Sequence, residues 1–190
     1  MGRHRARSQG ISSFADDSST IGEAYLTNNT ITNSGTIIAD NVGVAIRGEE
    51  GGYPSNTVFT HGNSVNNSGS MEVYNGSGII VGEAGNPSGS YTWDNTIDNT
   101  GTILAGEDVA IGIYGDAEYN GSGSSGSNTL NLGAPGFIAG DIVLDEEANV
   151  DVTLTSGASH SVSWTFEDDF SGGAAGPRSV SISEDSQACL

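Results

Sequence analysis

The chain has 190 residues, with 24 acidic side chains against five lysines and arginines, which gives a formal net charge of −19 at pH 7. This excess of negative charge disfavours nucleic acid and anionic membrane surfaces as partners, and a solvated acidic coat is its simplest interpretation. The 29 glycines follow no three-residue period, which excludes a collagen-like chain. The one cysteine, Cys189, cannot form an internal disulfide.

Residues 1–18 are predicted to be a polar, disordered N-terminus. Their first seven residues are basic, but no apolar stretch follows them. We therefore expect neither a secretory signal nor a transmembrane span in this chain.

A phrase that begins with asparagine then recurs along the chain. It reads NTITNSGTI at residues 29–37, related phrases begin at Asn63 and Asn95, and a weaker copy begins at Asn128. The leading asparagines are 34, 32 and 33 residues apart. A period in this range is typical of a stack of structural units, each packed against the next.

Each copy divides into three short segments that are rich in β-branched residues, which in the first copy are 30–32, 36–39 and 44–46. An Asn-Ser/Thr-Gly turn separates the first two, and its glycine can adopt a positive φ without a Cβ penalty. Gly, Asn, Thr and Ser are poor helix formers. The sequence therefore predicts an all-β fold, a right-handed parallel β-helix (β-solenoid) of about four to five rungs with three short strands per rung.

The β-helix is expected over residues 19–168, and a polar tail over 169–190. A rung of about 20 residues is long enough for three short strands and their corners. This length places rungs near 29–48, 63–82, 95–115 and 128–145, with a final rung or a terminal hairpin at 148–166. The rest of each period is then expected to be an insert at one edge of the solenoid: 49–62, 83–94 and 116–127.

Alternation of apolar and polar residues predicts columns of stacked side chains inside the solenoid. The first column comprises Ile31, Val65, Ile97 and Leu130. The second comprises Ile37, Met71, Ile103 and Ile138. The third side is lined by Val44, Ile46, Ile79, Val81, Ile111, Ile113, Ile142 and Leu144. One rung alone cannot offset the entropy lost on ordering it, so stability requires stacking.

The leading asparagines are interpreted as a structural ladder: Asn29, Asn63, Asn95 and Asn128. Stacked side-chain amides can each donate a hydrogen bond to the next carbonyl, as they do in cross-β stacks. We therefore expect these four side chains to be hydrogen-bonded in series along the solenoid axis.

The expected inserts carry aromatic residues that are candidates for partner binding: Tyr53, Phe59, Tyr91, Trp93 and Tyr119. Aromatic rings on a polar edge can stack on sugar rings or anchor a protein partner. The alternative is that these rings fold back and cover the side of the solenoid, and the sequence favours neither.

No group of residues predicts catalysis, a cofactor or a metal. The histidines at 4, 61 and 160 share no metal-ligand spacing, and no Gly-x-Ser-x-Gly elbow selects a nucleophile. Acidic pairs such as Glu49-Glu50 could form a glycosidase pair or bind Ca²⁺, but solvated turns are the simpler interpretation. The GSGSSG run at 121–126 matches a dinucleotide-binding motif only in its letters, because no helix follows it.

The phrases TNSGTI at 32–37 and DNTGTI at 98–103 resemble the repeats of bacterial autotransporter passenger domains, and residues 128–142 resemble the last rungs of such passengers. The similar region covers about residues 20–168. The resemblance implies a β-helix that is secreted or displayed on the bacterial cell surface, as an adhesin, stalk or display scaffold. Its partners would be host-cell surface glycans or proteins. It would reach a membrane only through a β-barrel translocator, which we do not expect within these residues.

We therefore expect a non-enzymatic passenger fragment, and two other interpretations stay open. One is a carbohydrate-active β-helix enzyme, either a polysaccharide lyase or a glycoside hydrolase. A lyase requires a basic residue beside a charge-neutralising cation, and Arg47 is the only cationic side chain in the repeat region. The other is a truncated remnant without independent function.

Overall fold

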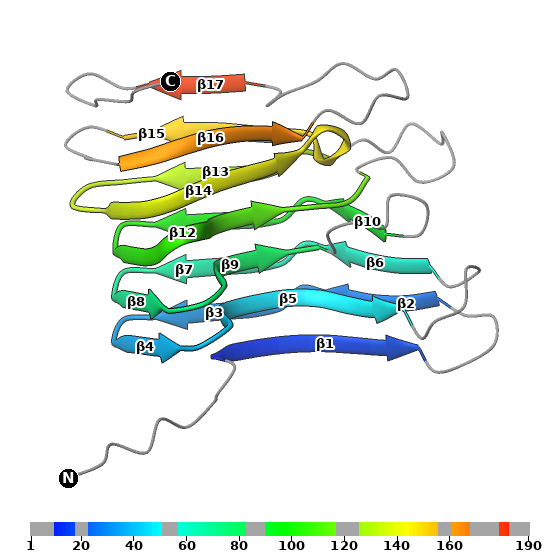
Figure 1. Ribbon diagram of the computed structural model, residues 1–190. Helices are drawn as coiled ribbons and strands as arrows, with labels where there is room; N and C mark the ends of the chain where they lie inside the picture. Colours follow the sequence, from blue (N-terminus) through cyan, green and yellow to red (C-terminus); the bar gives the residue numbers. More distant parts are fainter. Residues whose placement is uncertain are drawn as a thin grey trace, which may run out of the picture.

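A computed structural model describes residues 10–17, 23–50, 57–82, 90–116, 126–155, 161–167 and 179–182, with the backbone alone at some of these positions. The described chain is a parallel β-helix whose wall consists of three sheets (Figure 1). A short 3₁₀ turn, η1 (Glu146–Ala148), is the one helical element in these ranges. The predicted fold class is thus confirmed.

The three sheets are named A, B and C. Sheet A comprises β1 (Ile11–Asp17), β4 (Thr36–Ala39), β5 (Val42–Glu50), β8 (Ser70–Val73), β9 (Ser77–Val81), β12 (Thr102–Ile113), β14 (Phe137–Asp145) and β16 (Ser161–Glu167). Sheet B comprises β2 (Glu23–Thr27), β6 (Thr57–His61) and β10 (Ser90–Trp93). Sheet C comprises β3 (Thr30–Asn33), β7 (Ser64–Asn67), β11 (Thr96–Asn99), β13 (Asn128–Leu132), β15 (Val150–Leu154) and β17 (Ser179–Ile182).

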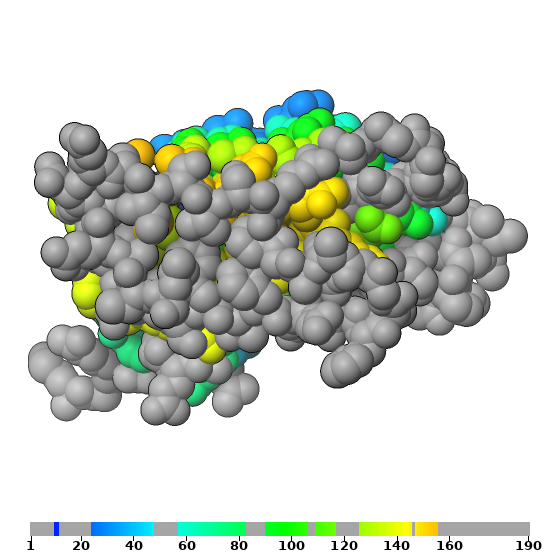
Figure 2. All heavy atoms as spheres, turned by 90° about the horizontal axis from the view of Figure 1, so that it is seen from above, coloured from blue at the N-terminus to red at the C-terminus, as the bar shows by residue number. Residues whose placement is uncertain are grey.

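The solenoid is right-handed. In Figure 1 the chain runs from left to right along β5 at the front and returns from right to left behind it along β6 and β7, and each turn lies above the one before. Seen from above in Figure 2, residues coloured from blue to yellow lie along one rim, so successive rungs lie over one another.

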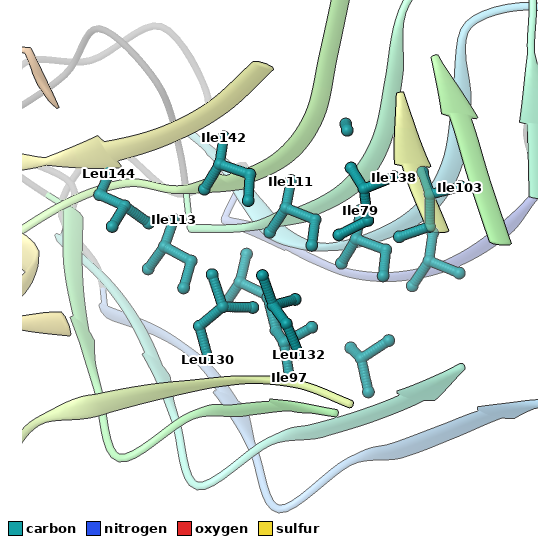
Figure 3. Packing of buried hydrophobic residues seen from close by; sticks show 14 of the residues in the cluster. Ile79, Ile97, Ile103, Ile111, Ile113, Leu130, Leu132, Ile138, Ile142 and Leu144 are labelled. Carbon is teal, nitrogen blue, oxygen red and sulfur yellow. The ribbon is translucent and has the colours of Figure 1, made fainter. Parts of the chain in front are cut away.

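The predicted core columns are present in the register of the sheets. Ile31 pairs with Val65, Val65 with Ile97 and Ile97 with Leu130 in sheet C. The second and third columns follow the same rule in sheet A. Figure 3 shows side chains of sheet A, such as Ile111 and Ile142, pointing across the interior toward Ile97 and Leu130. Most of this cluster is completely buried.

The division of each period into a rung and an insert is wrong for the first two copies. Residues 57–61 and 90–93, which we expected inside inserts, are the wall strands β6 and β10. They pair in parallel with each other, and β6 also pairs with β2. In these two copies the whole period is therefore one turn of the solenoid, because the strand in sheet B is part of the ring.

The rung becomes shorter toward the C-terminal end. Asn128 pairs with Val150 and Ala139 pairs with Ser161, so partners here lie 22 positions apart in the chain, against 34 for Thr30 and Ser64. In the described residues, sheet B has no strand beyond β10. The predicted rung of about 20 residues therefore applies to this narrower end.

Both expected polar ends contribute strands. β1 lies within residues 1–18 and pairs with β5, and β17 lies within 169–190 and pairs with β15. Their backbones form hydrogen bonds with a neighbouring rung, and such bonds can order a segment whose composition is polar. β15 and β16 pair in parallel with strands of the preceding rung. Of the two alternatives for residues 148–166, the additional rung is therefore correct and the terminal hairpin is wrong.

The turn glycines after the recurrent asparagines serve close packing. A Cβ on Gly69 would lie 2.1 Å from the carbonyl oxygen of Gly35, and a Cβ on Gly101 would lie 2.2 Å from that of Gly69. The sequence suggested that these glycines allow a positive φ, but none of the three has one. Glycine is required at positions 69 and 101 because the backbones of successive turns touch there.

Replacing Ile103 by alanine should lower the free energy of unfolding by about 2–5 kcal/mol, because the side chain is fully buried and a cavity would remain. Ile38, also in sheet A but 57% exposed, provides the matched control, and Ile38→Ala should change stability by less than about 0.5 kcal/mol. Urea unfolding followed by circular dichroism measures both. Equal losses in the two variants would contradict this assignment of core and surface.

Candidate functional site

A column of aromatic rings lies on the outer face of sheet B. Tyr25, Phe59 and Tyr91 occupy matching positions in β2, β6 and β10. The Tyr25 and Phe59 ring centroids are 4.7 Å apart with an interplanar angle of 17°, and those of Phe59 and Tyr91 are 5.6 Å apart at 21°. Parallel pairing places the three rings face to face, because the spacing between neighbouring strands is close to the spacing between stacked aromatic rings.

Two further stacked rings lie beside this column of three. His61 and Trp93 are register partners whose rings stack at 4.5 Å with an interplanar angle of 8°. Trp93 also meets Phe59 edge-on, at 5.9 Å and 79°. The two stacks therefore form one continuous aromatic surface, called here the aromatic platform: Tyr25, Phe59, His61, Tyr91 and Trp93.

Exposure differs sharply within the aromatic platform. Phe59 is 3% exposed, whereas Tyr25 in the first strand of sheet B is 55% exposed. Tyr91, Trp93 and His61 are half-buried. Because the ring faces are stacked along the solenoid axis, a ligand approaching from the side meets ring edges, and Tyr25 offers the largest accessible ring area.

The structure brings together three of the five aromatic residues predicted from the sequence: Phe59, Tyr91 and Trp93. They lie on wall strands, so neither alternative, a displayed insert or a folded-back cover, describes them. Tyr53 and Tyr119 lie outside the described residues. Tyr25 and His61 were missed, although their spacing from Phe59 and Trp93 matches the asparagine period and could have identified both.

The edge of sheet B next to β10 is closed by the backbone. The Thr92 N–H donates to the Asp116 carbonyl oxygen at 2.7 Å, and the Asp116 N–H donates to the Ser90 carbonyl oxygen at 3.0 Å. Asp116 thereby forms an isolated bridge with Tyr91 and ends this sheet. The platform is consequently bounded on this side by a carboxylate-bearing residue.

The inner face of sheet B changes from apolar to polar along the axis. Leu26 in β2 is followed in the same column by Thr60 and then Thr92. The hydroxyls of Thr60, Thr92 and Ser90 are buried and have no hydrogen-bond partner among the described residues. Unpaired buried hydroxyls are costly, so sheet B contributes less to stability than the aliphatic columns of sheets A and C.

The predicted asparagine ladder is present at the corner between sheets B and C. The Asn29 side-chain amide donates to Asn63 Oδ1 at 3.0 Å, Asn63 to Asn95 Oδ1 at 2.9 Å, and Asn95 to Asn128 Oδ1 at 2.9 Å. Each amide of the last three also donates to a backbone carbonyl of the sheet B strand in the preceding rung, at Leu26, Thr60 and Thr92. The ladder therefore also satisfies backbone acceptors of sheet B.

A second ladder lies at the other end of the sheet C strands, and the sequence interpretation missed it. The Asn33 amide donates to Asn67 Oδ1 at 2.8 Å, and the Asn67 amide donates to Asn99 Oδ1 at 2.7 Å. These residues recur with the same period as the first ladder, so the signal was present in the sequence. Sheet C is thus held at both ends by side-chain amides.

The described residues hold no cluster of three or more His, Cys, Asp or Glu side chains that could bind a metal ion. Within the same ranges, no helix has the length and apolar character needed to cross a bilayer. No protein-family model, curated protein or solved structure matches the chain.

Replacing Asn95 by alanine should lower the free energy of unfolding by about 1–3 kcal/mol for each buried partner left without a hydrogen bond. Asn41→Ala is the matched control, because Asn41 is exposed in a turn. Denaturant titration of both variants measures the difference. An Asn95→Ala protein as stable as the control would show that the ladder does not stabilise the fold.

Proposed function

We propose that this chain is a non-enzymatic binding and display scaffold of the autotransporter passenger kind, located on the bacterial cell surface or secreted. In this role the β-helix is a rigid stalk, and the aromatic platform is the surface that contacts a partner. The partner is a host-cell surface glycan or protein. The observation that carries the proposal is the alignment of five rings from three rungs on one outer face.

The aromatic rings of the platform favour a ligand that presents apolar C–H groups or apolar side chains. The exposed ring of Tyr25 and the ring edges of the platform are suited to contacts with the C–H groups of sugars and with the anchoring side chains of protein partners. The rings of the platform are pre-ordered by stacking on one another. A partner therefore binds without the entropy loss that ordering of flexible side chains would add.

The charge of the chain supports a neutral or cationic partner. A formal net charge of −19 repels nucleic acid and anionic lipid, and it attracts ligands with the opposite charge. The recurrent TNSGTI-like phrases support the passenger interpretation by resemblance, and the parallel β-helix fold is compatible with it.

Tyr25→Ala and Trp93→Ala should each weaken partner binding by at least about tenfold, because each removes an accessible ring of the platform. A glycan array and a host-cell binding assay with the labelled full chain measure this loss. Point substitutions suit the test better than deleting residues 49–62 or 83–94, which would remove the wall strands β6 and β10.

Tyr74→Ala is the matched control for these variants, because Tyr74 is also an exposed tyrosine (40%) but follows β8 on sheet A. Binding should be unchanged in this variant. Unchanged binding in Tyr25→Ala and Trp93→Ala, or an equal loss in all three variants, would contradict a role for the platform.

The purified chain should show no turnover on a panel of polyuronates and neutral polysaccharides. A lyase needs a base beside the sugar ring, and Arg47 is the only cationic side chain of the repeat region. Release of unsaturated products, measured by ultraviolet absorbance and abolished by Arg47→Ala, would overturn the non-enzymatic proposal.

A further inference from the structure

The turn between β8 and β9 contains the one Asn-Gly pair in the described ranges, Asn75-Gly76. Asn75 is exposed, and both residues lie in a bend outside the strands. The side-chain amide of Asn75 makes no hydrogen bond to any described residue, in contrast to the amides of the two ladders. This amide is therefore accessible to its own backbone and to water.

Hydrogen bonds hold the chain on both sides of this pair. The Asn75 N–H donates to the Asp40 carbonyl oxygen at 2.8 Å, and the Ser77 N–H donates to the Asn41 carbonyl oxygen at 2.8 Å. Between them, the Gly76 N–H has no hydrogen-bond partner in the described part of the chain. The one backbone nitrogen that can attack the Asn75 side chain is thus left available.

We propose that Asn75 is a site of spontaneous deamidation. The Gly76 nitrogen attacks Cγ of Asn75, a new C–N bond closes a five-membered succinimide, and the side-chain nitrogen leaves as ammonia with the proton lost from Gly76. Water then opens either carbonyl of the ring, which gives aspartate or isoaspartate. The net change is addition of one water and loss of one ammonia, with no oxidant or reductant.

The geometry selects this asparagine over the others described. Gly76 has no Cβ to obstruct the attack, whereas Asn41 in the adjacent turn is also exposed but precedes the β-branched Val42. The ladder asparagines Asn63, Asn67, Asn95 and Asn99 are buried and hydrogen-bonded. Asn120-Gly121, the other such pair in the sequence, lies outside the described residues.

The product changes the charge and the packing of this corner. The formal net charge becomes one unit more negative than −19. The new carboxylate belongs to a residue whose backbone is hydrogen-bonded to Asp40 of the preceding rung. Isoaspartate also lengthens the main chain by one carbon. Gly76 is packed against the preceding turn, because a Cβ there would lie 2.0 Å from the Asn41 carbonyl oxygen, so this lengthening displaces Gly76 from that contact. The hydrogen bond from Ser77 at the start of β9 is then the first contact to be disturbed.

Incubation of the folded full chain in mildly alkaline buffer, followed by peptide mass spectrometry, tests the proposal. Asn75 should deamidate at least about tenfold faster than Asn41, which corresponds to a barrier lower by about 1.4 kcal/mol. Aspartate and isoaspartate should both form at position 75. Asn75→Gln should remove this reaction, because glutamine would have to close a larger ring. The substitution leaves the tightly packed Gly76 unchanged.

A second incubation in urea separates the effect of the turn from that of the dipeptide. Comparable rates at Asn75 in the folded and unfolded chain support the proposal, because they show that the turn leaves the reaction open. If Asn75 reacts no faster than Asn41 in the folded chain, or reacts rapidly only in urea, the turn protects the residue and the proposal is wrong.

Discussion

Parallel pairing between successive rungs is the interaction on which the rest of the structure depends. Every described strand pairs in parallel with a counterpart from an adjacent turn, so each side chain lies beside the residue at the matching position of that turn. A single turn buries too little apolar surface to be stable, and stacking supplies both the ladder hydrogen bonds and the covered columns. The period of the sequence is therefore a requirement of the fold.

This pairing gives each class of residue a common role along the axis. Isoleucines and valines become buried columns, asparagines become amide ladders, and turn glycines allow backbones to touch. The same geometry stacks Tyr25, Phe59 and Tyr91 on the outside. The aromatic platform thus has the same physical origin as the core, but it lies on the outer side of sheet B, where Tyr25 is its most exposed ring.

The repeat made the columns and the first ladder predictable because both depend on residues that share one period. The second ladder, through Asn33, Asn67 and Asn99, had the same signal but was interpreted as part of a turn. Sheet B was missed for a different reason. Its strands carry aromatic residues on the outer face, and in β10 the inner residues Ser90 and Thr92 are small and polar, which reverses the usual apolar-in pattern. Tyr91 and Trp93 therefore looked like exposed insert residues.

The sequence by itself determined the class of fold, the period, the three aliphatic columns and the identity of most ring-bearing residues. These follow from local alternation and from spacing, which act along the chain. The tertiary structure decided how many residues close one turn, where the solenoid narrows after Asn128, and which rings share a face. Those properties depend on ring closure and on contacts between rungs, and neither is encoded in any single repeat.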